Sequence, residues 1–101
     1  MKSLNGKVGV VLGAVKGIGK AISLSLAEQG CSLALSRFDW PESFASMESD
    51  LNNAGADYNI YDVNLLDIKQ VESMFQDIDN RFGRLDILIN NIERGGWPAV
   101  H

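Results

Sequence analysis

Hydrophobic and polar positions along this chain follow two periods, one typical of buried strands and the other typical of helices. Short apolar runs of strand length recur, and each of the first three is followed by a longer segment with apolar positions three and four residues apart. The predicted strands are residues 8–12, 33–35, 58–63 and 85–89. Strands that alternate with helices in this way form a parallel sheet through right-handed crossovers.

Each predicted helix has an apolar stripe and a residue at which it ends. The first stripe ends before Gly30 and is predicted to contain Ile18, Ala21, Ile22, Ser25, Leu26 and Gln29. The second follows Pro41, ends at Gly55 and contains Phe44, Met47, Leu51 and Ala54. The third begins after Asp67, ends at Gly83 and contains Ile68, Val71, Met74, Phe75, Ile78 and Phe82.

A glycine-rich turn joins the first predicted strand to the first predicted helix. Gly13 permits a backbone conformation closed to other residues, Gly17 allows the main chain to approach a pyrophosphate, and Gly19 allows close packing of helix and strand. The N–H groups of residues such as Ile18 at the helix start favour phosphate. A tight turn without a ligand is the alternative, but the placement between strand and helix favours a dinucleotide site.

Composition excludes several classes of function. The formal net charge of −4 provides no attraction for nucleic acid or an anionic membrane, and no apolar run is long enough to span a bilayer. Cys31 is the only cysteine, which excludes an internal disulfide and fits a cytoplasmic location. With His101 as the only histidine, we expect no metal site.

Two motifs identify a family resemblance. The turn has the spacing G-x-x-x-G-x-G, and residues 81–91 are RFGRLDILINN. Both resemble the short-chain dehydrogenases/reductases, and the resemblance covers nearly the whole chain. It implies a Rossmann-type three-layer α/β/α fold with a parallel sheet in the order 3-2-1-4, half of the doubly wound arrangement. Residues 1–101 are then the N-terminal part of a single NAD(P)-binding domain.

The chain departs from the family pattern at two places. Leu12 stands where the family has threonine, so we expect the turn to lack a steadying side-chain hydrogen bond. Ile92 and Glu93 follow the paired asparagines in place of Ala-Gly, and the glutamate crowds the cofactor site unless the loop takes another course.

Basic residues at two positions favour NADP over NAD, although NAD use stays open. An NAD-specific site has an acid at the end of the second strand, where this chain has Arg37. A guanidinium can bind a 2′-phosphate in a bidentate manner. The resemblance implies that Lys16 also binds the 2′-phosphate. The alternative is that both charges are solvated, and pairing of Arg37 with Asp39 would weaken the prediction.

The adenine pocket has two possible alignments with the family's Asp-Val pair. Asp62 and Val63 match by residue type, but counting from Val71 and from Gly55 places the pair at Asn64 and Leu65, which we prefer. The Asn64 amide oxygen and the Leu65 N–H then contact adenine. The resemblance also places Asn90 beside the adenosine half of the cofactor. For both asparagines the alternative is a purely structural role.

The family's chemistry is hydride transfer between NAD(P)(H) and an alcohol or carbonyl, and it requires Y-x-x-x-K. At that spacing Tyr58 is followed by Asp62 and Tyr61 by Leu65, so no catalytic residue carries over. We expect this chain alone to be inactive and the complete protein to be a homo-oligomeric enzyme with a small-molecule substrate. A non-catalytic, regulatory dinucleotide-binding protein is the alternative. A flavodoxin-like receiver is disfavoured because no acids follow the first strand.

Overall fold

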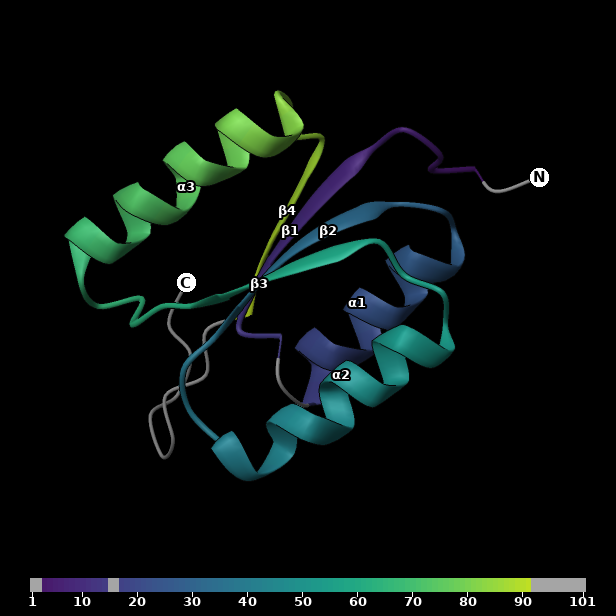
Figure 1. Cartoon of the computed structure of the whole chain (residues 1–101), viewed down its shortest axis with the longest axis horizontal. Coiled ribbons are helices and arrows are strands. Elements are labelled where there is room, and N and C mark those ends of the chain that lie inside the picture. The colour runs from purple at the N-terminus through teal and green to yellow at the C-terminus, as the bar shows by residue number, and fades with distance from the viewer. Residues whose placement is uncertain (1–2, 15–16, 92–101) are drawn as a thin grey trace.

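The computed structural model describes residues 3–14 and 17–91. Within these residues, strands and helices alternate as predicted (Figure 1). The elements are β1 (Val8–Leu12), α1 (Gly17–Glu28), β2 (Ser32–Arg37), the 3-10 helix η1 (Pro41–Ser43), α2 (Phe44–Asn53), β3 (Tyr58–Asp62), α3 (Ile68–Phe82) and β4 (Ile87–Asn90).

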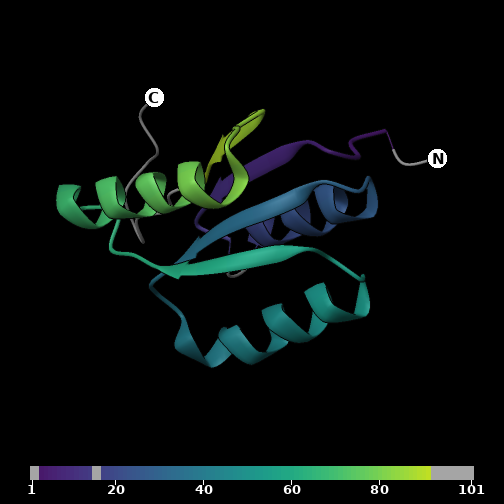
Figure 2. The ribbon, with the colours of Figure 1, turned by 45° about the horizontal axis from the view of Figure 1, so that its top comes forward.

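The strands form one parallel sheet in the order β3-β2-β1-β4, which confirms the predicted topology. Helices α1 and α2 cover one face of the sheet and α3 covers the other, as Figures 1 and 2 show from two directions. The described chain is therefore the three-layer α/β/α arrangement. The register places Arg37, at the end of β2, beside Asp62 at the end of β3.

Alternate residues of the central strands build two separate cores, one on each face. The core under α1 and α2 contains Val11, Leu33 and Leu35, whereas the core under α3 contains Val10 and Ala34. Successive strand residues point to opposite faces, and helices cover both faces here, so β1 is apolar throughout rather than alternating. Burial of each large side chain stabilises the fold by about 1.5–3 kcal/mol.

Helix α3 begins and ends where the sequence predicts. The Asp67 carboxylate caps it by accepting hydrogen bonds from the N–H groups of Lys69 and Gln70. The helix ends at Gly83, which has a left-handed backbone and donates its N–H to the Asp79 carbonyl. The buried face includes Met74 and Ile78 as predicted, but Ile68 is 73% exposed because it lies in the first turn, beyond the edge of the core.

The predicted stripe of α1 is wrong at most of its positions, although Leu26 does pack against the core under α1 and α2. Its buried residues are Gly19, Ser23 and Ala27, while Ile18 and Ala21 are exposed. The buried residues are small because α1 packs closely on the sheet and leaves no room for long side chains. Contact between backbones, rather than the volume of apolar side chains, therefore decides which side of α1 faces inwards.

Candidate functional site

The carboxyl ends of the parallel strands meet at one edge of the sheet, where open α/β folds bind ligands. This edge carries Leu12, Arg37, Asp62 and Asn90, the last residues of the four strands. The predicted site residues on the described chain therefore belong to one edge. Lys16 lies outside the described residues, as do Ile92 and Glu93, the second departure from the family pattern.

The glycine turn is tied to both neighbouring strands. Gly13, with φ of 80°, donates its N–H to the Ser36 Oγ over 2.9 Å, and the Ala14 N–H donates to the Ser36 carbonyl over 3.0 Å. On the other side, the Asn91 amide donates to the Gly13 carbonyl over 3.3 Å. A side-chain hydrogen bond does steady the turn, despite Leu12. It comes from Ser36 of β2, and Leu12 is buried in the core under α3.

Gly19 permits the contact between α1 and this turn. A Cβ atom on Gly19 would lie 2.0 Å from the Gly13 carbonyl oxygen, far inside any real contact distance. The Ser23 hydroxyl donates to the Gly19 carbonyl over 2.8 Å and so leaves no polar group unsatisfied on the buried face. No other residue type fits at position 19 without moving the helix.

Gly17 has the opposite surroundings. Its φ is 63°, and a Cβ atom there would meet nothing within 4 Å. It begins a helix with no acidic residue in its first turn, and Ile18 beside it is 69% exposed. Room beside Gly17 at the positive end of a helix dipole lets a pyrophosphate approach the first N–H groups of α1, so the described residues fit a dinucleotide.

Arg37 is held by residues that the sequence analysis did not assign to it. Its Nε donates to Asp62 over 2.7 Å, its Nη1 donates to Glu48 over 3.1 Å, and its guanidinium lies 4.1 Å from the centre of the Phe44 ring. Burial lowers the pKa of Arg37, but the bonds to the two carboxylates outweigh it and raise that pKa above its ordinary value. The guanidinium therefore stays charged. Its acidic partners are Asp62 and Glu48 rather than Asp39.

The segment after β3 contains the predicted adenine-binding residues. The Asn64 side-chain oxygen accepts from the Leu66 N–H over 3.0 Å, and the Asn64 N–H donates to the Gln70 side chain over 2.8 Å. The oxygen retains a second lone pair for a ligand. Leu65 packs against the core under α3. The roles of Asn64 and Leu65 towards adenine stay predictions.

The paired asparagines differ in position. Asn90 is exposed and lies beside Leu12 in the register. Asn91 donates its backbone N–H to the Leu12 carbonyl at the end of β1 and its side-chain amide to the Gly13 carbonyl in the turn. The role of Asn90 beside the cofactor stays a prediction. Asn91 and Ser36 position the turn, and neither was predicted as a site residue. The one signal for each was its place in the sequence, since Ser36 directly precedes Arg37 and Asn91 directly follows Asn90.

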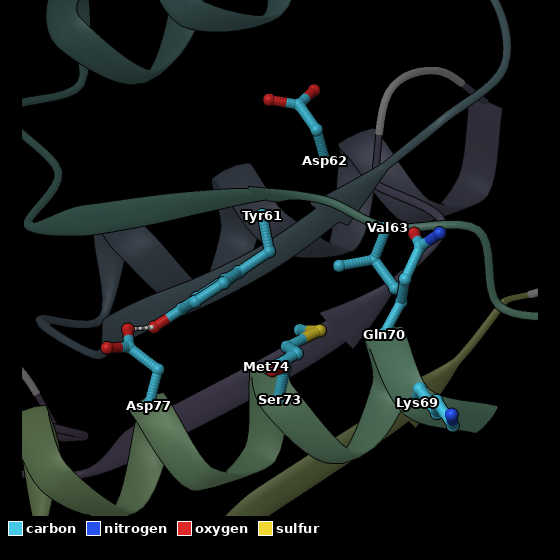
Figure 3. Close-up of a pocket in the computed structure, with 8 residues that line it drawn as sticks. All are labelled: Tyr61, Asp62, Val63, Lys69, Gln70, Ser73, Met74 and Asp77. Atoms are coloured by element: carbon cyan, nitrogen blue, oxygen red, sulfur yellow. Dashed lines mark hydrogen bonds between the residues drawn. The ribbon is translucent and has the colours of Figure 1, made fainter. Parts of the chain in front are cut away.

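A groove of about 570 Å³ lies between β3 and α3. Figure 3 shows Tyr61 reaching along it to Asp77 of α3, where the phenol donates over 2.5 Å. Burial and the bond to Asp77 raise the pKa of Tyr61, so its proton is held more firmly than in water. In the described part of the chain, no cluster of metal-ligating side chains occurs and no helix could cross a membrane.

Comparison with known proteins places most of this chain in one family. The short chain dehydrogenase family model matches residues 7–96. The 3-oxoacyl-(acyl-carrier-protein) reductase FabG of Staphylococcus aureus is 33% identical over 85 residues, which are 84% of this chain and 35% of that protein. The chain thus spans about a third of the length of the curated relatives it matches.

Solved structures superpose on the same region. A metagenomic short-chain oxidoreductase in complex with NADP is 31% identical, with a TM-score of 0.83 over 92% of this chain and 42% of that one. YwfH, an NADPH dependent reductase involved in bacilysin biosynthesis, is 36% identical, with a TM-score of 0.78 over 93% of this chain and 40% of that one. By sequence, topology and the glycine turn, this chain belongs to the short-chain dehydrogenase family.

Proposed function

We propose that this chain binds NADP(H) at the carboxyl edge of its sheet, as the cofactor-binding part of an oxidoreductase. The observation that carries the proposal is the contrast between two glycines, Gly17 beside open space and Gly19 against the Gly13 carbonyl. Open space alone does not mark a ligand, since Gly55 is equally open in the turn between α2 and β3. Gly17 differs because it begins α1, whose first N–H groups and dipole favour a bound anion.

Each described residue of the edge has a defined task in this proposal. Gly13, Gly17 and Gly19 shape the turn, and the first N–H groups of α1, including that of Ile18, bind the pyrophosphate. Asn64, Leu65 and Asn90 line the adenosine half. When bound, the cofactor supplies the hydride that passes between it and an alcohol or carbonyl substrate. The chain's own contribution is to bind and orient the cofactor.

Arg37, together with Lys16, favours the phosphorylated cofactor in this proposal. A guanidinium attracts a 2′-phosphate, whereas an acid at the same position would repel it. The similar solved structures include an oxidoreductase in complex with NADP and an NADPH dependent reductase, which supports the choice. Because Arg37 is already paired with two carboxylates, we expect the preference for NADPH over NADH to be modest.

The proposal assigns no proton transfer to this chain. The Tyr58 hydroxyl donates to Asn52 over 2.8 Å and the Tyr61 hydroxyl donates to Asp77. In neither of these contacts is the partner of the phenol a lysine. We therefore expect the 101-residue chain alone to oxidise no NADPH with a ketone. In a protein of the relatives' full length, we propose a cytoplasmic, homo-oligomeric enzyme acting on a small alcohol or carbonyl compound.

Two matched glycine substitutions test the binding site. Gly17 and Gly55 have nearly the same φ, 63° and 68°, and a Cβ atom at either would meet nothing within 4 Å. Alanine at either position should therefore cost a similar stability, about 1 kcal/mol, through the same backbone strain. Only Gly17→Ala should weaken binding of NADPH, by about tenfold or more, since Gly55 lies in the turn between α2 and β3.

Calorimetric titration of NADPH and NADH into the wild-type chain and both variants measures this difference. Thermal unfolding of the same samples shows whether the two substitutions are equally destabilising. Equal loss of affinity in Gly17→Ala and Gly55→Ala would assign the effect to stability and contradict the proposed site. Equal affinities of the wild-type chain for NADPH and NADH would contradict the preference for NADP(H).

A further inference from the structure

The Arg37 guanidinium lies between two carboxylates that come from different elements. Asp62 belongs to β3 and is the register neighbour of Arg37, whereas Glu48 belongs to α2. In Figure 3 the Asp62 side chain points away from α3, so it faces the side of the sheet on which α2 lies. One positive charge therefore meets two negative charges at this point, leaving a net charge of −1 for the group.

Exposure differs sharply among these side chains. The Arg37 side chain is only 16% exposed, but Glu48 and Asp62 are 44% and 64% exposed. The Phe44 ring packs against the guanidinium and restricts where it can move. An incoming anion therefore meets the two more exposed carboxylates before it meets the guanidinium.

The two carboxylates occupy different donors of the guanidinium. Asp62 accepts from Nε over 2.7 Å, whereas Glu48 accepts from Nη1 over 3.1 Å. The two terminal nitrogens, Nη1 and Nη2, form the fork that binds a phosphate with two parallel hydrogen bonds. Glu48 accepts from one of these two terminal nitrogens through the longer contact, while Asp62 contacts neither of them.

We propose that Glu48 determines cofactor preference by competing with the 2′-phosphate for the Nη1 end of Arg37, while Asp62 positions the guanidinium. The inference rests on the proposed function, because it concerns the same phosphate subsite. A phosphate of about −2 charge approaching a group of net charge −1 is repelled as well as attracted. Loss of the Glu48 charge removes both the competitor and the repulsion, so it should favour NADPH selectively.

Neutralisation of Glu48 in the full 101-residue chain tests the proposal. Glu48→Gln keeps the size and the acceptor oxygen, and it should raise the ratio of NADPH affinity to NADH affinity about threefold to fivefold, the range of a partly exposed charge pair. Adenosine 2′,5′-bisphosphate and 5′-AMP, titrated in parallel, should show the same change because they differ only in the 2′-phosphate. Glu48→Ala should change the ratio in the same direction.

The matched control is Asp50→Asn, which removes one negative charge from the same helix. Asp50 pairs with Lys20 of α1 over 2.6 Å and not with Arg37, so its loss should change the ratio less than about twofold. In an Arg37→Gln background, Glu48→Gln should no longer raise the ratio. These two expectations separate a contact at Arg37 from a general change in charge.

Each remaining outcome decides either against both proposals or against the inference on Glu48 alone. If the wild-type chain binds neither nucleotide, the proposed function fails and this inference fails with it. If the nucleotides bind but Glu48→Gln leaves the ratio unchanged, only the inference on Glu48 is overturned. The same holds if Asp50→Asn has an equal effect, or if the effect of Glu48→Gln persists without Arg37.

Discussion

The centre of the sheet and its β4 edge have similarly apolar sequences but very different surroundings. All residues of β1 are buried, whereas β4, with the sequence ILIN, alternates between half-buried and exposed positions. Leu33 of β2 is completely buried and Leu88 of β4 is 50% exposed. Apolar sequence alone therefore does not decide burial. The number of neighbours on both faces and both edges decides it, and β4 pairs only with β1 among the described strands.

Truncation of one leucine on each strand should give the largest difference between the two regions. Leu33→Ala should destabilise the chain by about 2–5 kcal/mol because it leaves a cavity in the closed core under α1 and α2. Leu88→Ala should cost about 0.5 kcal/mol or less. Urea unfolding of both variants measures the contrast, and similar losses would show that β4 is buried against something else in solution.

Acid should weaken the attachment of β4 to β1. Asp86, just before β4, accepts from the Val8 N–H over 2.8 Å and from Arg84. The bonds from Arg84 and Val8 lower the pKa of Asp86 to about 2. The folded chain therefore releases this proton more readily than the unfolded chain, whose aspartate pKa is about 3.9. The carboxylate stabilises folding above about pH 4, and this contribution disappears as the pH falls towards 2.

Urea unfolding between pH 2 and pH 7 tests this dependence. The stability difference between wild type and Asp86→Asn should be greatest near neutral pH and should vanish near pH 2. Asp79→Asn, on the exposed side of α3, is the control and should leave the pH dependence of the wild type in place. A stability difference between wild type and Asp86→Asn that stays constant over the whole pH range would show that the charge of Asp86 does not stabilise the pairing of β4 with β1.

Leu88→Lys should have the smallest effect on stability but a visible effect on association. The outer side of β4 pairs with no strand in the described part of the chain, and Leu85 and Leu88 are exposed beside it. An apolar strand edge is a template for pairing with another chain, and a lysine discourages such pairing. We expect wild type to self-associate in light scattering after size exclusion and Leu88→Lys to do so less, with unchanged thermal unfolding. A monomeric wild type would contradict this.

Local patterns were sufficient for most of the fold. The strand positions, the parallel topology, the Asp67 cap and the end of α3 at Gly83 all follow from residues close together in the chain. Backbone preferences and hydrophobic periods act over a few residues, so the sequence displays them directly. The fourth strand shows the limit of that precision, since it was predicted at 85–89 and begins at Ile87.

Long-range contacts decided the details of the candidate site. Arg37 acquires Asp62 and Glu48, which lie 25 and 11 residues away, rather than the nearby Asp39. Ser36 steadies the glycine turn by accepting from Gly13, which lies 23 residues earlier in the chain. No local period encodes such pairs, because strand register and helix docking bring them together.

By itself, the sequence determined that this chain is a parallel α/β sheet with a glycine turn suited to a dinucleotide. Only the tertiary structure decided which side of α1 faces inwards and which carboxylates hold Arg37. The physical reason is the same in both cases. Helix α1 approaches until the Gly13 carbonyl and Gly19 are in contact, and Arg37 pairs with whatever charge the register and α2 place beside it.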